Sequence, residues 1–292
     1  MANLKFGSYR VDAIKRNLRY VDIKPLDVMI TGATGAGKST TLNTIFQTTL
    51  AKVGDGVDPE TMEVNGYKLN DVFRLLDTPG LGDGVDIDKK HGEKILDLLH
   101  SSRFYDETGL IAFVDMCLVI VDGSSRDLGT TYKLINEILV PNINLDVGIN
   151  TIVDINNNIV DIKCDGDIVV PSIEPDRVFV AINQADMAMK GYHWDKENNI
   201  PDSTLTAYLE EQALSVKRRI KEATGLNVIK PVCYSAKYGW NLESVFDMLI
   251  DNIPQERPLT YMSRFQEQSH RQFEEFNRCS QRCVEWWREQ GW

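Results

Sequence analysis

The segment Gly32-Ala-Thr-Gly-Ala-Gly-Lys38-Ser39 constrains the fold of this chain more than any other segment does. It fits the pattern G-x-x-x-x-G-K-[ST]; an apolar stretch over 26–31 precedes it and a helix-prone stretch over 38–47 follows it. Glycines let backbone N–H groups curl around a phosphate, which also meets the positive end of the next helix. The order of strand, glycine turn and helix therefore predicts a loop that binds the phosphates of a nucleotide.

Two side chains of this loop have expected roles in holding the phosphates. We expect Lys38 to reach the β- and γ-phosphates, and the hydroxyl of Ser39 to ligate Mg²⁺. Mg²⁺ is thus the cofactor that the segment predicts.

Charge and composition narrow the class of protein. The 292 residues carry a formal net charge of −11, which argues against a broad nucleic-acid surface. No run of 18 apolar residues occurs and no apolar leader opens the chain, so neither a membrane span nor a signal peptide is expected. Five scattered cysteines, an odd number, favour a reducing compartment, and the predicted location is cytoplasmic.

Strand and helix patterns alternate along most of the chain. Buried strands are predicted over 26–31, 115–121, 177–182 and 231–235, and helices over 38–47, 88–102, 127–140, 204–224 and 242–252. An antiparallel pair is predicted over 62–69 and 72–77, with its turn near Asn70-Asp71 or at Asn65-Gly66. This alternation predicts an α/β three-layer sandwich of the P-loop NTPase kind, with a mainly parallel sheet covered on both faces.

Three segments fall outside that alternation. Residues 1–25 predict an amphipathic helix before a nucleotide-binding domain over 26–257, and residues 141–176 predict an inserted β-meander. Asp161, Asp165 and Asp167 of the insert fit a hairpin turn with solvated edges better than a cation site. Residues 258–292 predict a helical tail with an aromatic face, either docked on the core or used for self-association or a partner.

The segment Asp77-Thr78-Pro79-Gly80 ends a strand expected beside the strand of the phosphate loop. Alone, this segment is an ordinary turn. At the end of a neighbouring strand, Asp77 is placed to hold Mg²⁺ through water, and the N–H of Gly80 lies near a γ-phosphate. The segment therefore predicts the second half of a phosphate and metal site.

The segment Asn183-Gln184-Ala185-Asp186 follows the strand predicted over 177–182. The carboxylate of Asp186 can accept two hydrogen bonds from the N1–H and exocyclic amine of guanine, whereas adenine offers no such donor pair. We expect Asn183 to tie this loop to the phosphate loop. Ser235-Ala236-Lys237, after the next strand, is expected to cover the base. A helix N-cap turn is the alternative for this Asx-rich segment.

In this order and spacing, the motifs resemble those of the translation-factor-related class of P-loop GTPases, with Era-like GTPases first and septins and plastid import receptor GTPases second. The resemblance covers residues 26–253. It implies phosphate and Mg²⁺ roles for Lys38 and Ser39, a sensor role for Asp77 and Gly80, and a switch threonine. Thr61 is the chosen threonine, with Thr48 and Thr49 as alternatives.

The resemblance thus implies catalytic roles for Lys38, Thr61 and Gly80 and metal ligation by Ser39, Thr61 and Asp77. The residues expected to contact the nucleotide are Gly32, Ala33, Thr34, Gly35, Ala36, Gly37, Lys38, Ser39, Thr40, Asp77, Gly80, Asn183, Gln184, Asp186, Ser235, Ala236 and Lys237.

Three positions depart from the family pattern. Gln184 replaces the lysine whose stem stacks over the base in the family, so a lower affinity for guanine nucleotides is expected, while Asp186 keeps the selectivity. Leu81 follows Gly80 where a water-orienting glutamine is usual, so intrinsic hydrolysis is expected to be slow or assisted by a partner. Gly35 replaces the asparagine of potassium-activated relatives, so potassium activation is not supported.

The function that follows is a guanine-nucleotide-binding protein with slow, Mg²⁺-dependent GTP hydrolysis, which switches through residues 50–62 and 80–92. Two alternatives stay open, a septin-like assembly protein without turnover and an ATPase. Expected partners are GTP and GDP, an effector protein of unknown identity, and a second copy of the chain bound through the nucleotide domain or the C-terminal helix.

Overall fold

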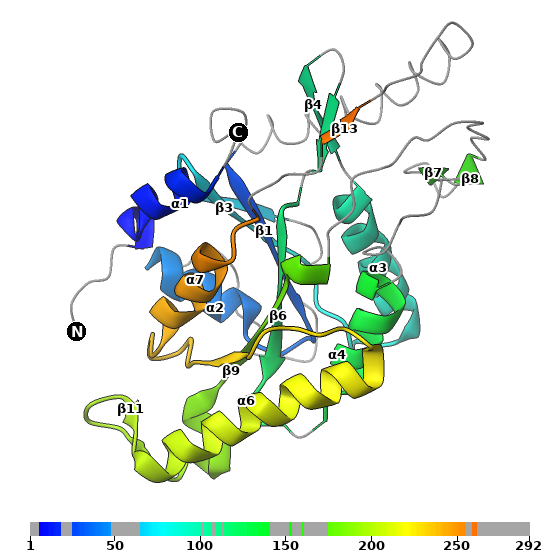
Figure 1. Cartoon of the computed structure of the whole chain (residues 1–292). Coiled ribbons are helices and arrows are strands. Elements are labelled where there is room, and N and C mark those ends of the chain that lie inside the picture. Colours follow the sequence, from blue (N-terminus) through cyan, green and yellow to red (C-terminus); the bar gives the residue numbers. More distant parts are fainter. Residues whose placement is uncertain are drawn as a thin grey trace, which may run out of the picture.

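A six-stranded sheet forms the centre of the computed structural model (Figure 1). The model describes residues 6–18, 25–47, 65–100, 102–106, 109–112, 114–125, 127–140, 152–153, 159–160, 175–254 and 259–261. The strands, in the order β12-β9-β6-β1-β3-β2, are Val232–Cys233, Val178–Asn183, Met116–Asp122, Leu26–Gly32, Phe73–Asp77 and Asn65–Asn70. Only β2 is antiparallel to its neighbour, which confirms the mainly parallel sheet.

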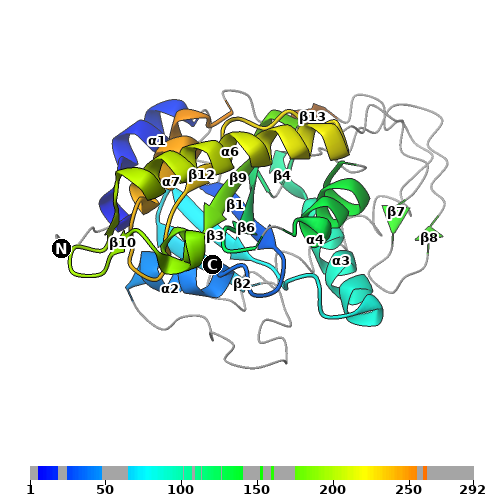
Figure 2. The ribbon, with the colours of Figure 1, turned by 90° about the horizontal axis from the view of Figure 1, so that it is seen from below.

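Helices cover both faces of this sheet, as Figures 1 and 2 show from two directions. One face carries α1 (Val11–Asn17), α2 (Lys38–Phe46) and α7 (Leu242–Asp251). The other face carries α3 (Val85–His100), α4 (Gly129–Lys133) with its π-helical continuation η2 (Leu134–Leu139), and α6 (Ser203–Thr224). The three-layer α/β sandwich predicted from the alternation of elements is therefore confirmed.

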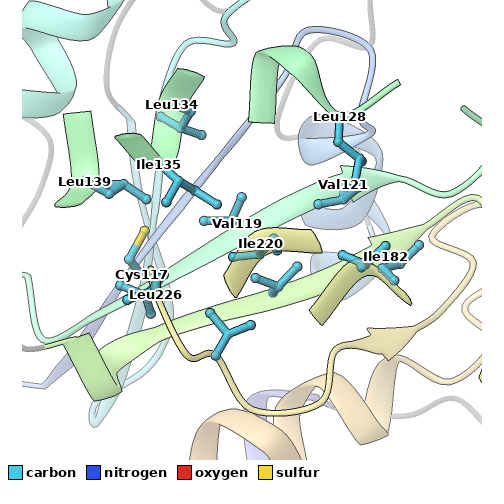
Figure 3. Packing of buried hydrophobic residues seen from close by; sticks show 14 of the residues in the cluster. Cys117, Val119, Val121, Leu128, Leu134, Ile135, Leu139, Ile182, Ile220 and Leu226 are labelled. Atoms are coloured by element: carbon cyan, nitrogen blue, oxygen red, sulfur yellow. The ribbon is translucent and has the colours of Figure 1, made fainter. Parts of the chain in front are cut away.

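The central strands are buried on both faces because each face has its own hydrophobic core. In β6, Cys117, Val119 and Val121 pack with residues of α4, η2 and α6 (Figure 3). Met116, Leu118 and Ile120 alternate with them and join the opposite core with α2 and α7. The period of two along a strand therefore divides one continuous apolar run between two cores.

Helix α6 shows how sequence signals set the bounds of an element. Asp202 caps its start, where a carboxylate oxygen accepts a hydrogen bond from the Leu205 N–H at 2.9 Å. Gly225 ends it with a φ of 75°, a left-handed conformation that glycine adopts without a steric penalty. Leu205, Leu209 and Ile220 lie along its buried stripe. The predicted helix over 204–224 is confirmed within one residue.

A three-stranded sheet corrects two predictions near the amino-terminal edge of the main sheet. It contains β4 (Ser102–Asp106), β5 (Gly109–Ala112) and β13 (Leu259–Tyr261), in the order β13-β5-β4. Helix α3 ends at His100, so the predicted helix over 88–102 is shifted towards Val85. The predicted helical tail begins instead with a strand, because Leu259, Thr260 and Tyr261 pair with the edge of β5. Residues 262–292 lie outside the described residues.

The predicted insert is described in part. Its strands β7 (Ile152–Val153) and β8 (Ile159–Val160) pair antiparallel, as predicted for the first two runs of the meander. Asp161, Asp165, Asp167 and the third run lie outside the described residues. A second hairpin, β10 (Trp194–Asp195) with β11 (Ile200–Pro201), and the 3₁₀ segment η4 (Ala185–Gly191) before it were not predicted.

Helix α1 is shorter than the predicted segment 1–25 and packs on α7. A 3₁₀ turn, η1 (Phe6–Ser8), precedes it. Ile14 and Leu18 are buried, and Arg10 donates hydrogen bonds to Asp247 at 2.6 Å and to Asp251 at 2.5 Å. Among the described residues, no helix combines the length and the apolar character needed to cross a membrane.

Candidate functional site

The candidate residues gather at one edge of the main sheet. The parallel strands β1, β3, β6 and β9 end at Gly32, Asp77, Asp122 and Asn183. Because the carboxyl ends of parallel strands share an edge, the loops after these strands meet there. The predicted phosphate loop, Asp77 segment and base segment are three of these loops.

The phosphate loop is built around glycines that no other residue could replace without strain. Gly37 has a φ of 92°, and a Cβ placed on it would lie 2.1 Å from the Nδ2 atom of Asn183. Gly32 lies as close to the next strand, since its Cβ would lie 2.3 Å from the carbonyl oxygen of Ile120. At these two glycines the loop backbone packs closely against the ends of β6 and β9, directly before α2 begins at Lys38.

Lys38 is buried beneath the phosphate loop. Its ammonium donates hydrogen bonds to the carbonyl oxygens of Gly32 and Ala33, both at 3.1 Å. Burial lowers its pKa from 10.5 to about 8, against the opposing effect of the charges of Asp77 and Asp83. An anion bound in the loop would offset the cost of this buried positive charge.

Asp77 is the matching buried acid. Neither of its carboxylate oxygens has a hydrogen-bond partner among the described residues. Burial raises its pKa from 3.8 to about 6, although the charge of Lys38 acts in the opposite direction. Buried carboxylates are normally paired or bound to a metal, so these two free oxygens fit a hydrated Mg²⁺. Ser39, another predicted metal ligand, is a partly exposed residue in the first turn of α2.

Gly80 lies directly against the phosphate loop. A Cβ on Gly80 would lie 2.5 Å from Oγ1 of Thr34 and 2.8 Å from Nζ of Lys38. The next residue forms a bridge with the loop, since the Thr34 N–H donates to the Leu81 carbonyl at 2.7 Å. The structure therefore brings Lys38, Asp77 and Gly80 together, as the sequence predicted.

The side chain of Leu81 points away from this site. It is 2% exposed and belongs to the core between the sheet and α3. A leucine there anchors the loop and offers no polar group to a water molecule.

Polar side chains that were not predicted fix the loop after Gly80. Asp83 accepts a hydrogen bond from the Thr34 hydroxyl at 2.6 Å. Asp88 accepts hydrogen bonds from the N–H groups of Gly82 and Asp83, at 2.7 and 3.1 Å. In the sequence, Asp83 stands three positions after Gly80, the last residue of the predicted Asp77-Thr78-Pro79-Gly80 segment.

His91, on α3, also holds this loop, and no sequence signal pointed to it. Its Nδ1 lies 2.6 Å from the carbonyl oxygen of Gly80, and its ring is buried. A carbonyl accepts hydrogen bonds, so Nδ1 must carry the proton in this contact. Helix α3 is thereby attached to the glycine that packs on the phosphate loop.

Asn183 joins the base segment to the two neighbouring loops. Its Nδ2 donates to the carbonyl oxygen of Ala36 at 2.9 Å, and its Oδ1 accepts from the N–H of Ala236 at 2.9 Å. The tie to the phosphate loop was predicted, and the second tie extends it to the segment after β12. One buried amide therefore sets the distance between the phosphate loop and the two base loops.

The remaining base-segment side chains are held by the same loops. Asp186 is buried and accepts a hydrogen bond from the Ser235 hydroxyl at 2.6 Å. Gln184 donates to the carbonyl oxygen of Gly35 at 3.0 Å, with a φ of 63°. The glutamine thus replaces the expected lysine with a direct bond to the phosphate loop.

An aromatic cluster lies beside Ser235-Ala236-Lys237. The ring of Trp194, from β10, stacks on Tyr238 with centroids 5.6 Å apart and meets Trp240 edge-on at 5.7 Å. The Lys237 ammonium lies 5.0 Å from the centroid of the Tyr238 ring. The unpredicted β10–β11 hairpin therefore supports the segment expected to cover the base.

Part of the predicted site lies outside the described residues. This part contains Thr61, its alternatives Thr48 and Thr49, and the whole of the first predicted switch segment, 50–62. The second predicted switch segment, 80–92, is described throughout.

Comparison with known proteins supports a GTPase domain. Residues 27–153 match the family model described as 50S ribosome-binding GTPase. Over 115 residues the chain is 29% identical to "Probable GTP-binding protein EngB" of Lactobacillus helveticus and 30% identical to the protein of the same name in Lactobacillus acidophilus. These matches cover 38% of this chain and 57% of each relative, so the chain spans little more than half the length of these curated relatives.

The fold comparison extends over more of the chain. The structure of Toc33 from Arabidopsis thaliana in complex with GDP and Mg²⁺ matches 89% of this chain and 99% of its own length. Its TM-score is 0.51 at 12% identity, a likeness that shows the fold alone. The predicted P-loop GTPase fold is confirmed. The matches support the translation-factor-related class and leave the Era-like and septin-like assignments without confirmation.

Proposed function

We propose that this chain binds GTP and GDP with Mg²⁺ and hydrolyses GTP slowly to GDP and phosphate. The observation that carries this proposal is the double tie of Asn183, from Ala36 of the phosphate loop to Ala236 of the base loop. It holds a phosphate site and a buried carboxylate, Asp186, in one rigid frame. A carboxylate in that frame selects guanine, because adenine would leave it unpaired.

The phosphate end of the frame supports hydrolysis. Lys38 and the N–H groups of residues 35–39 would neutralise and orient the phosphates, and Ser39 and Asp77 would hold Mg²⁺, with Thr61 as the proposed switch ligand. Held by these residues, Mg²⁺ would supply positive charge that offsets the negative charge developing on the phosphates. The N–H of Gly80 would donate to the γ-phosphate, and the lack of a side chain lets this backbone lie against Thr34 and Lys38.

Slow turnover follows from Leu81. Since this side chain is buried in the core, it supplies nothing to a water molecule in the site. The same observation favours a second candidate function, an assembly protein in which GTP stabilises a dimer or an effector complex with little turnover. The two are separated by measuring turnover together with solution mass, each across protein concentration.

Switch behaviour is proposed for residues 50–62 and 80–92. The second segment reaches from Gly80 to α3, and His91 attaches the two. A γ-phosphate that accepts a hydrogen bond from the Gly80 N–H would move Gly80. Because His91 links Gly80 to α3, the start of α3 would move as well. The proposed organisation is an N-terminal segment over 1–25 that contains α1, a nucleotide domain over 26–257, and a segment over 258–292 that begins with β13. The buried free thiols of Cys117 and Cys233 fit a reducing cytoplasm.

The test of nucleotide hydrolysis uses the purified full chain with GTP or ATP and Mg²⁺. We expect phosphate release from GTP, and we expect unlabelled GTP, but not ATP, to displace a fluorescent GTP analogue. The control is Lys38→Ala, which should lower GTP affinity at least about 100-fold, because each charge-assisted hydrogen bond contributes about 1.5–3 kcal/mol. Equal affinity in Lys38→Ala by calorimetry, or equal competition by ATP, would refute the proposal.

Base selection has its own test. Asp186→Asn should shift preference from GTP towards xanthosine triphosphate, because the amide can donate to the 2-oxo group of xanthine. The change in the ratio of affinities is expected to be at least about tenfold, the size of one misplaced buried hydrogen bond. An unchanged preference for GTP would show that Asp186 does not contact the base.

A further inference from the structure

The buried side chain of Leu81 leaves open which group orients the attacking water. The second residue after it, Asp83, is partly exposed and carries the carboxylate that accepts the 2.6 Å hydrogen bond from the Thr34 hydroxyl. This contact lies on the solvent side of the phosphate loop, where both partners can meet a bound water.

The position of the Thr34 hydroxyl shows where this carboxylate lies. The hydroxyl oxygen is 2.5 Å, and the Lys38 nitrogen 2.8 Å, from the point that a Cβ on Gly80 would occupy. Under the proposed function, Lys38 and Gly80 are the groups that meet the γ-phosphate. The Asp83 carboxylate is therefore one hydrogen bond away from the γ-phosphate end of the site.

The backbone around Asp83 is fixed on both sides. Asp88 accepts hydrogen bonds from the N–H groups of Gly82 and Asp83, and the Leu81 carbonyl accepts one from the Thr34 N–H. These contacts between protein groups hold the loop against the phosphate loop. A carboxylate carried on such a loop is placed in advance, which is what an orienting group needs.

We infer that Asp83 is a catalytic residue that accepts a hydrogen bond from the attacking water, in the place where Leu81 supplies none. The inference rests on the proposed function. The water oxygen forms the new bond to the γ-phosphorus, and the bond from phosphorus to the β–γ bridging oxygen breaks. That electron pair leaves with GDP, and the proton that the water loses ends on the released inorganic phosphate.

The opposite role for the same contact is a latch that closes the site and must open before GTP can bind. The two roles predict different effects on GTP affinity when the carboxylate is removed. A group that orients water speeds hydrolysis and leaves GTP affinity nearly unchanged, whereas a latch weakens binding, so that its removal would raise affinity.

The first experiment measures single-turnover GTP hydrolysis and the affinity for a non-hydrolysable GTP analogue in the full chain. Asp83→Asn should hydrolyse GTP at least about tenfold more slowly, a modest share of the 10²–10⁴-fold typical of acid–base groups. Its affinity should stay within about twofold of wild type. The control, Glu93→Gln, alters a carboxylate on α3 just past the expected switch segment and should match wild type. An unchanged rate, or a rise in affinity with Asp83→Asn, would overturn the inference.

A second variant separates lost chemistry from a disturbed loop. Asp83→Ala removes the carboxylate and leaves space, so added formate should restore at least part of the lost rate. Restoration with formate but not with chloride supports the inference, and a lost rate that formate does not restore overturns it. If wild type itself releases no more phosphate than Lys38→Ala, the proposed function fails, and that result is distinct from an equal rate in Asp83→Asn.

Discussion

Strand β3 carries a buried ionic group near each end, and the two environments differ. Near its start, Arg74 donates two hydrogen bonds to the carboxylate of Asp27, at 2.5 and 2.6 Å. At its end, Asp77 has two buried oxygens without a partner among the described residues, beside a buried Lys38. Only two residues, Leu75 and Leu76, separate Arg74 from Asp77 on this strand.

The difference indicates which end of the strand is structural and which is functional. The Asp27 and Arg74 pair has the bidentate geometry that a buried ion pair needs to offset its desolvation. Asp115 fixes the backbone beside this pair, since its carboxylate accepts a hydrogen bond from the Asp27 N–H at 2.8 Å. The Asp77 end keeps its desolvation penalty in the absence of a ligand, which a bound cation and phosphate would relieve.

The largest expected effect on stability comes from the Asp27–Arg74 ion pair near the start of β3. Arg74→Ala should lower the free energy of unfolding by about 3–5 kcal/mol, because it leaves the carboxylate of Asp27 buried without its cation. Urea unfolding followed by circular dichroism measures this change. The double variant Asp27→Leu/Arg74→Met should recover most of the loss, since an apolar pair replaces an ionic one. A loss under about 1 kcal/mol in Arg74→Ala would remove the contrast between the two ends.

The next expected effect is a gain in stability, and it concerns Asp77 at the other end of β3. The pKa of Asp77 is about 6 in the folded chain, against 3.8 when unperturbed. The folded state therefore holds the proton more tightly, and stability is lost as pH rises from about 4 through 6. Asn copies the protonated form, so Asp77→Asn should stabilise the nucleotide-free chain by about 1–3 kcal/mol at pH 8 and by well under half of that near pH 4.5.

The measurement is urea unfolding at both pH values without nucleotide or Mg²⁺. The exposed Asp71→Asn, which alters a surface pair with Lys68, serves as the control and should change stability little at either pH. Asp77→Asn should also lose the dependence of GTP affinity on Mg²⁺. Destabilisation by Asp77→Asn at pH 8 would show that the buried charge is already satisfied.

The smallest expected effect concerns the hydrogen bond between Gln184 and Gly35, at the edge of the sheet where the candidate site lies. Gln184→Ala removes the 3.0 Å hydrogen bond to the Gly35 carbonyl and should lower GTP affinity by about 0.5–1.5 kcal/mol. Because this hydrogen bond is exposed to solvent, its loss should leave the unfolding midpoint nearly unchanged. Gln184→Lys, which can donate to the same carbonyl, should keep the affinity of the wild type. If both variants lose affinity equally, calorimetry would assign Gln184 a role other than this bond.

The parts of the molecule that could be predicted are those with a repeating or local signal. The central strands follow from apolar runs such as 115–121, and α6 follows from its stripe and from Gly225. The phosphate loop, Asp77 and Asn183 follow from motifs that the physics of phosphate binding imposes. Sequence reasoning also placed the Asn183 tie correctly, because one amide between two adjacent loops has few other partners.

The parts that could not be predicted depend on contacts between distant segments. His91 meets Gly80, and β13 meets β5, through tertiary packing that no period in the sequence records. Residues 259–261 pair with a free strand edge, which overrides the helical pattern that follows them. Asp83 is separated from Thr34 by 49 positions, and its role depends on the direction in which Leu81 turns.

The aromatic cluster beside the base loop supplies an optical signal that needs no label. Of the five tryptophans in the chain, Trp194 and Trp240 pack against each other edge-on. Both lie beside the base loop: Trp194 stacks on Tyr238, and the Trp240 carbonyl accepts a hydrogen bond from the Ser235 N–H. Replacing Trp286, Trp287 and Trp292 by Phe would confine the indole emission to this pair. The wavelength and intensity of that emission would then follow entry of the base into its loop in real time, separately from events at the phosphates.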